Sequence, residues 1–111
     1  MASKRNAAKI LRKAAKLIEV HGFVKYSFGS YEHGFCALGA LSAAGRGTTA
    51  GDRKSIGDRS LAAKALNRRL YTVSGFGSVA TYNDLQDTTA QDITKFLRGT
   101  ARALEHGLVV K

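Results

Sequence analysis

Apolar and charged residues between Asn6 and Val20 recur with the period of an amphipathic helix. A helical projection places six apolar side chains on one face: Ala7, Ile10, Leu11, Ala14, Leu17 and Ile18. The opposite face carries five cations, named here the cationic stripe: Arg5, Lys9, Arg12, Lys13 and Lys16. With Ser3 as the N-cap and Gly22 as the stop, this pattern predicts a helix that buries one face and exposes the other.

A second stretch, Gly34–Gly45, has no charged residue and is rich in alanine. Alanine and leucine favour helix, and Gly45 is a natural stop signal. The run is much shorter than the roughly 20 apolar residues that span a bilayer, so we expect a buried helix at the centre of the fold. Cys36, the only cysteine of the chain, falls in the first turn of this predicted helix.

The polar, glycine-rich segment that follows, within residues 45–58, predicts a surface loop. It lacks the Gly-Lys-Ser/Thr sequence of a phosphate-binding loop. The next predicted helix is Arg59–Thr72, capped by Asp58 or Ser60. Its apolar stripe consists of Ala62, Ala63, Leu66, Leu70 and Val73, and Lys64 and Arg68 add positive charge.

The last part of the chain predicts one short turn and one long helix. Ser78 can cap a turn over Val79–Tyr82, which Asn83 and Asp84 end. Thr88–Gln91 has the spacing of a capping box for the final helix, which we expect to end near His106. Its inward residues are predicted to be Ile93, Phe96, Leu97, Ala101 and Leu104.

Alternation of Val24, Tyr26 and Phe28 with polar residues predicts a strand. Gly29-Ser30 would form the turn of a hairpin, and Tyr31–Phe35 its return strand. The aromatic residues of this segment could stack on bases, although core packing is the commoner role of clustered aromatics. Together these elements predict one α+β, mainly α domain over residues 1–111, with about four helices around the central Ala/Gly-rich helix and a small β-hairpin.

The charge of the chain suggests a function, which the pattern of apolar and polar positions alone does not. With 18 basic and 8 acidic residues, the formal net charge is +10. Such a balance favours an anionic partner, either nucleic acid, an anionic membrane surface or an acidic protein. The residues expected to bind nucleic acid or an acidic host protein are Arg5, Lys9, Arg12, Lys13, Lys16, Lys64 and Arg68. The competing interpretation of the stripe is an ordinary solvated helix face.

The single cysteine cannot form an internal disulfide, which favours a reducing compartment. No apolar signal core follows the basic N-terminus, and no run of about 18 apolar residues suggests a membrane span. We therefore expect a cytoplasmic protein without a membrane partner. No pattern indicates a cofactor.

Three short motifs in order carry a resemblance: His21-Gly22-Phe23, Cys36-Ala37-Leu38-Gly39-Ala40-Leu41, and Val79-Ala80-Thr81-Tyr82-Asn83-Asp84. The chain resembles, from about Ile10 to Leu104, a family of small uncharacterised proteins of actinobacteria and their phages, a domain of unknown function. The family pattern has tryptophan where this chain has Phe23 and Tyr82. The resemblance implies a small, mainly helical domain and a phage origin, and it implies no activity.

The same motifs supply the residue types of a Cys-His hydrolase or transferase, which is the alternative function. A helix N-terminus favours the thiolate of Cys36, His21 or His33 could act as base, and Asn83 could orient it. Each residue also has a structural interpretation, because a lone cysteine is usually a small buried apolar residue. One cysteine and three scattered histidines do not have the paired spacing of a metal site.

Overall fold

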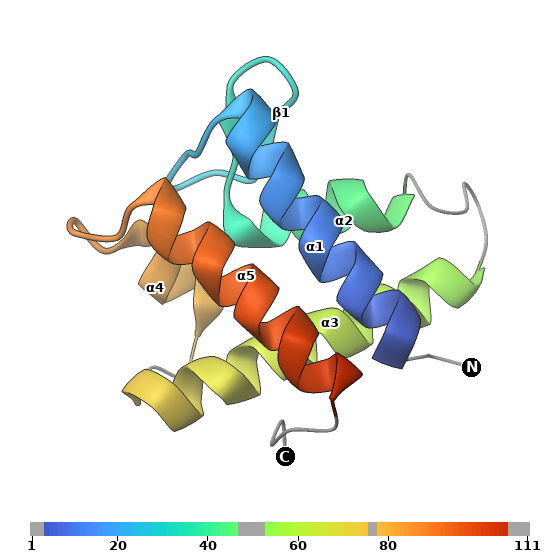
Figure 1. Cartoon of the computed structure of the whole chain (residues 1–111). Coiled ribbons are helices and arrows are strands. Elements are labelled where there is room, and N and C mark those ends of the chain that lie inside the picture. Colours follow the sequence, from blue (N-terminus) through green and yellow to red (C-terminus); the bar gives the residue numbers. More distant parts are fainter. Residues whose placement is uncertain (1–3, 47–52, 76–77, 107–111) are drawn as a thin grey trace.

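The computed structural model describes residues 4–46, 53–75 and 78–106. These residues form five helices and one two-stranded hairpin, in the order α1 (Lys4–His21), β1 (Gly29–Ser30), β2 (Gly34–Phe35), α2 (Ala37–Arg46), α3 (Arg53–Ser74), α4 (Val79–Asp84) and α5 (Ala90–Glu105). The α+β, mainly α fold class predicted from the sequence is confirmed. Figure 1 shows α1 and α5 side by side, with α3 crossing behind them.

Helix α1 provides the centre of the core, and its buried face is wider than predicted. Leu17 is half-buried, and the other predicted apolar residues are buried together with two further alanines: Ala7, Ala8, Ile10, Leu11, Ala14, Ala15 and Ile18. This face packs most extensively against α5, and also against α2 and α3. The predicted N-cap, Ser3, lies outside the described residues.

Helix α5 buries all five residues predicted to face inward, but its cap lies one residue later than predicted. The capping box joins Thr89 and Asp92: the Asp92 N–H donates to Thr89 Oγ1, and the Thr89 N–H donates to Asp92 Oδ2. Thr88 cannot cap the helix, because its hydroxyl donates to the carbonyl of Tyr82, at 2.8 Å, and its side chain is buried.

Helix α2 is the predicted central helix, shortened at its start because Gly34 and Phe35 form β2. Leu41 and Ala44 are buried as expected, whereas Leu38 is only half-buried. Gly39 is required where α2 approaches residue 28, since a Cβ atom at this position would lie 1.9 Å from the main-chain oxygen of Phe28. The loop before β1 therefore rests directly on α2.

Helix α3 begins earlier than predicted. It starts at Arg53, so that both predicted caps, Asp58 and Ser60, lie inside the helix, and the loop predicted over residues 45–58 is partly helical. Asp58 is itself buried. The sequence prediction placed the start of α3 too late, because Asp58 and Ser60 are of residue types that usually precede a helix as its N-cap. Residues 47–52 of the predicted loop lie outside the described part.

The predicted strand over residues 24–28 is wrong, and so is the predicted turn at Gly29-Ser30. These two residues form β1 and pair with Gly34 and Phe35 of β2, so the turn lies at residues 31–33. Gly34 has a φ of 96°, and a Cβ atom there would lie 2.5 Å from the carbonyl carbon of Gly22. Close approach of these two glycines holds the hairpin against the end of α1.

Residues 24–26 are held by residues 83–86, at and just after the end of α4, and the Val24 N–H also donates to the carbonyl of Phe35 in β2, at 3.2 Å. The Asn83 side chain donates to the carbonyl of Val24, and Lys25 Nζ donates to the carbonyl of Gln86, at 3.2 Å each. Ser78 caps α4 as predicted, accepting from the Thr81 N–H, and the helix extends to Asp84 rather than ending at Tyr82. Contacts distant in sequence thus override the local strand pattern.

Candidate functional site

The cationic stripe lies on the outer face of α1. All five of its residues are exposed, on the side of the helix opposite the buried alanines and leucines. Because α1 advances about 1.5 Å per residue, the charges from Arg5 to Lys16 extend over roughly 16 Å. The arrangement is a linear array of positive charge on a surface helix.

Two ion pairs join α1 and α5, and one of them uses Arg12 of the cationic stripe. Arg12 donates to both carboxylate oxygens of Glu105, and Arg98 donates to both oxygens of Glu19, at 2.6 Å each. Hydrogen bonds from Arg98 lower the pKa of Glu19, and those from Arg12 lower the pKa of Glu105. Within the described part of the chain no such pair involves Lys9, Lys13 or Lys16, so Arg12 is the partly neutralised member of the stripe.

Lys64 and Arg68 do not extend the stripe. Both are exposed on the face of α3 opposite its buried residues Ala62 and Leu66. Since α3 and α1 pack against each other through their buried sides, the two sets of cations point away from each other. The predicted binding residues therefore form two surfaces rather than one.

Cys36 immediately precedes α2 and occupies its N-cap position, rather than the first turn as predicted. Its Sγ accepts a hydrogen bond from the Gly39 N–H at 3.2 Å, which is the bond that a serine or aspartate makes as an N-cap. The residue is buried, with 8% of its surface exposed. The sulfur has a structural role in capping the start of the helix.

The structure does not join Cys36 to a histidine through a hydrogen bond in its described part. The His21 ring packs edge-on against Tyr31 and Phe35, and its Nδ1 lies 3.1 Å from the carbonyl oxygen of Tyr31. His33 is exposed beside Glu32. The hydrogen bond between thiol and imidazole that the Cys-His alternative would use is therefore not formed among the described residues.

Asn83, the third candidate of that alternative, connects α4 to the start of α2. Its Oδ1 accepts from the Ala37 N–H at 2.9 Å, and its Nδ2 donates to the Val24 carbonyl and to Asp84 Oδ1. The side chain is almost completely buried. Every polar atom of Asn83 is thus used to hold the protein together.

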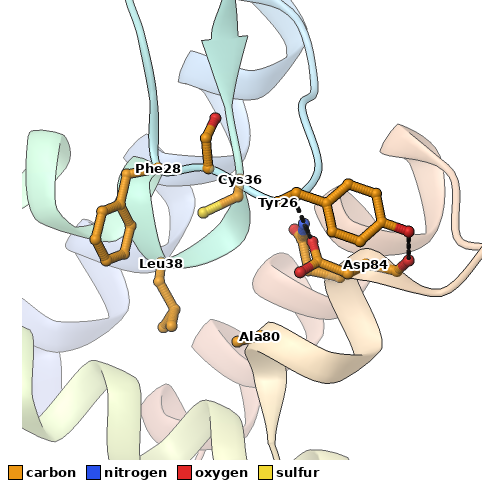
Figure 2. A pocket seen from close by; sticks show the side chains of 8 residues that line it. Tyr26, Phe28, Cys36, Leu38, Ala80 and Asp84 are labelled. Carbon is orange, nitrogen blue, oxygen red and sulfur yellow. Dashed lines mark hydrogen bonds between the residues drawn. The ribbon is translucent and has the colours of Figure 1, made fainter.

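A cavity of about 620 Å³ opens at this junction and is named here the Cys36 cavity. Its lining residues are Tyr26, Ser27, Phe28, Cys36, Leu38, Ala80, Asn83 and Asp84. Figure 2 shows Phe28 and Leu38 on one side, Tyr26 and Asp84 on the other, and Cys36 and Ala80 between them. The loop before β1, the start of α2 and helix α4 each supply part of the wall.

Tyr26 forms the rim of the cavity in a rare conformation. Its φ of 66° lies in the left-handed region, which bulky residues seldom adopt. Its N–H donates to Asp84 Oδ1 at 2.8 Å, and its hydroxyl donates to the Asp84 main-chain oxygen at 3.0 Å. Contacts at both ends of the residue stabilise the unusual backbone.

The expectation that the aromatic cluster packs in the core is wrong for three residues. Tyr26, Phe28 and Tyr31 are 80%, 69% and 59% exposed, whereas Phe35 is buried. The sequence identified Cys36 and Asn83 but not the cavity, because the alternation of Tyr26 and Phe28 with polar residues predicted a strand in place of an exposed loop.

The described residues contain no group of three or more histidine, cysteine, aspartate or glutamate side chains able to hold a metal ion. None of the described helices combines the length and the apolar character that crossing a membrane requires.

Comparison with known families bears on the whole of this arrangement. A family described as a family of unknown function, DUF6197, matches residues 2–103. The chain belongs to this family. No curated protein matches the chain, and no solved structure does.

In this DUF6197 member the three sequence motifs meet around the start of α2. Gly22 of the first motif packs against Gly34, two residues before Cys36 of the second. Asn83 of the third motif bonds to Ala37 of the second, and Gly39 packs against the loop that bears Tyr26 and Phe28. Residues far apart in the sequence thus form one structural unit, and the second and third motifs supply five of the residues that line the Cys36 cavity: Cys36, Leu38, Ala80, Asn83 and Asp84.

Proposed function

We propose that this protein binds nucleic acid through the cationic stripe of α1. The observation that carries the proposal is the row of exposed lysines, Lys9, Lys13 and Lys16, which form no ion pair within the described residues of a chain with a net charge of +10. A linear array of like charges on one helix costs self-repulsion, which an anionic partner relieves. A linear polyanion matches its shape as well as its sign.

The resemblance noted from the sequence extends this proposal to an accessory protein of actinobacteria or their phages, for which an acidic host protein is the second partner class. Both partners would use the same face. The Cys-His alternative gains no support from the site, since Asn83 is fully hydrogen-bonded and neither His21 nor His33 hydrogen-bonds to Cys36 in the described structure.

The experiment measures the affinity for duplex DNA, single-stranded DNA and RNA against salt concentration. Each phosphate contact contributes about 0.9 to the slope of log affinity against log salt for duplex DNA. Replacing Lys9 and Lys16 by glutamine should weaken binding and flatten the slope by about 1.8. The matched control removes Lys64 and Arg68 from α3 in the same way and should leave the slope unchanged.

Two results would contradict the proposal. If no nucleic acid binds at about 50 mM salt, the partner is not nucleic acid and the acidic protein becomes the leading class. If the α3 control flattens the slope instead, nucleic acid binds to the surface of α3 that bears Lys64 and Arg68, and not to the cationic stripe. Thermal unfolding of both variants should resemble that of the original chain, because the substituted residues are exposed and glutamine favours helix.

A further inference from the structure

We propose that the Cys36 cavity binds a small organic cation, a molecule with an aromatic body and an ammonium group. This site lies apart from the exposed stripe of α1 and has a different chemistry. Its volume of about 620 Å³ falls among the volumes typical of small-molecule sites, roughly 300–1,000 Å³. Such sites combine an apolar lining with a few convergent polar groups.

The charge of the cavity selects the charge of its ligand. Asp84 is the only charged side chain among the eight lining residues, in a chain whose net charge is +10. An anionic ligand would face this carboxylate. A neutral ligand without a hydrogen-bond donor would remove water from the carboxylate without replacing its hydrogen bonds, which is costly, and a neutral donor bonds a carboxylate less strongly than a charged one. A cationic ligand with an ammonium group avoids both problems, because it attracts the carboxylate and supplies a charged hydrogen-bond donor to it.

Asp84 has one oxygen held in place and one available. Oδ1 accepts from the Tyr26 N–H and from Asn83 Nδ2, at 2.8 and 3.0 Å. Oδ2 accepts no hydrogen bond from the described residues. The two bonds to Oδ1 fix the orientation of the carboxylate, and such preorganisation reduces the cost of binding.

The hydrogen-bond donors around the cavity are mostly used within the protein. Both N–H groups of Asn83 Nδ2 are engaged, with Val24 and Asp84, and the Tyr26 hydroxyl donates to the main chain of Asp84. Among the side chains that line the cavity, only the neutral Ser27 hydroxyl and Cys36 thiol remain to donate to a ligand. The strongest polar group left is an acceptor, so the ligand has to supply the donor.

The aromatic side chains select the body of the ligand. Tyr26 and Phe28 leave 80% and 69% of their surface in water, and they lie on opposite sides of the cavity (Figure 2). A flat aromatic molecule between them would remove apolar surface from water on both sides, and a cation near a ring face gains further. Leu38, which is half-buried and lies on the same side of the cavity as Phe28, adds apolar contact.

Three probes with one indole ring and different end groups test this proposal: tryptamine, tryptophol and indolepropionate. The chain contains no tryptophan, so indole fluorescence reports the probe alone. The measurement is made at about 0.15 M salt, which limits the long-range attraction of the anionic indolepropionate to the basic surface. Tryptamine should bind at least about tenfold more tightly than tryptophol, and indolepropionate should bind most weakly. Equal affinity of tryptophol or indolepropionate, or no saturable binding of tryptamine at millimolar concentration, would overturn the proposal.

Variants then place the site. Asp84→Asn keeps an acceptor for the Tyr26 N–H but removes the charge, and it should weaken tryptamine binding about tenfold while leaving tryptophol binding nearly unchanged. Ala80→Leu, at an exposed position of the wall, should weaken all three probes by filling the cavity. The matched control, Asp87→Asn, removes one exposed carboxylate that does not line the cavity and should change nothing. Tryptamine binding that is insensitive to both Asp84→Asn and Ala80→Leu would show that it binds elsewhere, and would overturn the assignment.

Discussion

The side-chain oxygen of Asn83, near the end of α4, accepts a hydrogen bond from the Ala37 N–H at the start of α2, over 2.9 Å. The two residues are 46 positions apart in the sequence. Through the same amide, α4 also holds the carbonyl of Val24. Asn83 therefore joins three segments, and together they form the Cys36 cavity.

Asn83→Ala should destabilise the protein by about 1–3 kcal/mol, because it leaves the Ala37 N–H and the Val24 carbonyl without a partner in a buried place. The measurement is the free energy of unfolding in urea. Asn83→Asp provides a control, since it keeps an acceptor for Ala37 but loses the donor to Val24 and places a second carboxylate beside Asp84. An unchanged urea midpoint for Asn83→Ala would show that this bond does not support the fold.

Gly39→Ala tests the close approach of the loop to α2. Alanine in place of glycine within a helix usually stabilises by about 1 kcal/mol. Here the new Cβ atom would lie 1.9 Å from the Phe28 main-chain oxygen, which cannot rotate away. Because overpacking of this kind typically costs about 1–3 kcal/mol, we expect a net loss of stability. The control is Ser42→Ala on the same helix, and a Gly39→Ala protein more stable than the original would contradict the described contact.

The two ion pairs between α1 and α5 predict how stability depends on pH. Hydrogen bonds from Arg98 and Arg12 lower the pKa of Glu19 and Glu105 in the folded state. A lowered pKa contributes stability above the unfolded pKa, about 4.3, and this contribution is lost as pH falls through the folded pKa. The urea midpoint should therefore decrease as pH falls below about 4.3.

Glu19→Gln isolates one pair in this measurement. Its urea midpoint should fall less steeply with pH over the same acid range, because the variant has one group fewer that must take up a proton. The effect should be small, since these carboxylates are exposed to solvent. Identical pH dependence of the variant and the original chain would show that the Arg98–Glu19 pair does not persist in solution.

Local patterns predicted α1 and α5 well, but they placed the start of α3 too late and did not reveal the site. The apolar period of α1 and α5 is decided by each helix's own residues, and both faces are confirmed. The strand predicted at residues 24–28 failed because Val24, Lys25 and Tyr26 bond to residues 83–86 of the distant α4 segment. Asp84 looked like a residue that only ends a turn, and its position in a cavity depends on that long-range contact.

The last prediction concerns the reactivity of Cys36. Burial beside Phe35 and Ala37 restricts the access of a reagent to the Cys36 sulfur, since only 8% of the residue is exposed. Alkylation by iodoacetamide should therefore be at least about tenfold slower in the native protein than in urea at the same pH.

Cys36→Ser should retain the N-cap bond, while Cys36→Ala should lower the free energy of unfolding by about 1 kcal/mol because it removes that bond. Faster alkylation of the native protein would show that the cavity exposes an activated thiol, and would favour the Cys-His alternative over a purely structural cysteine.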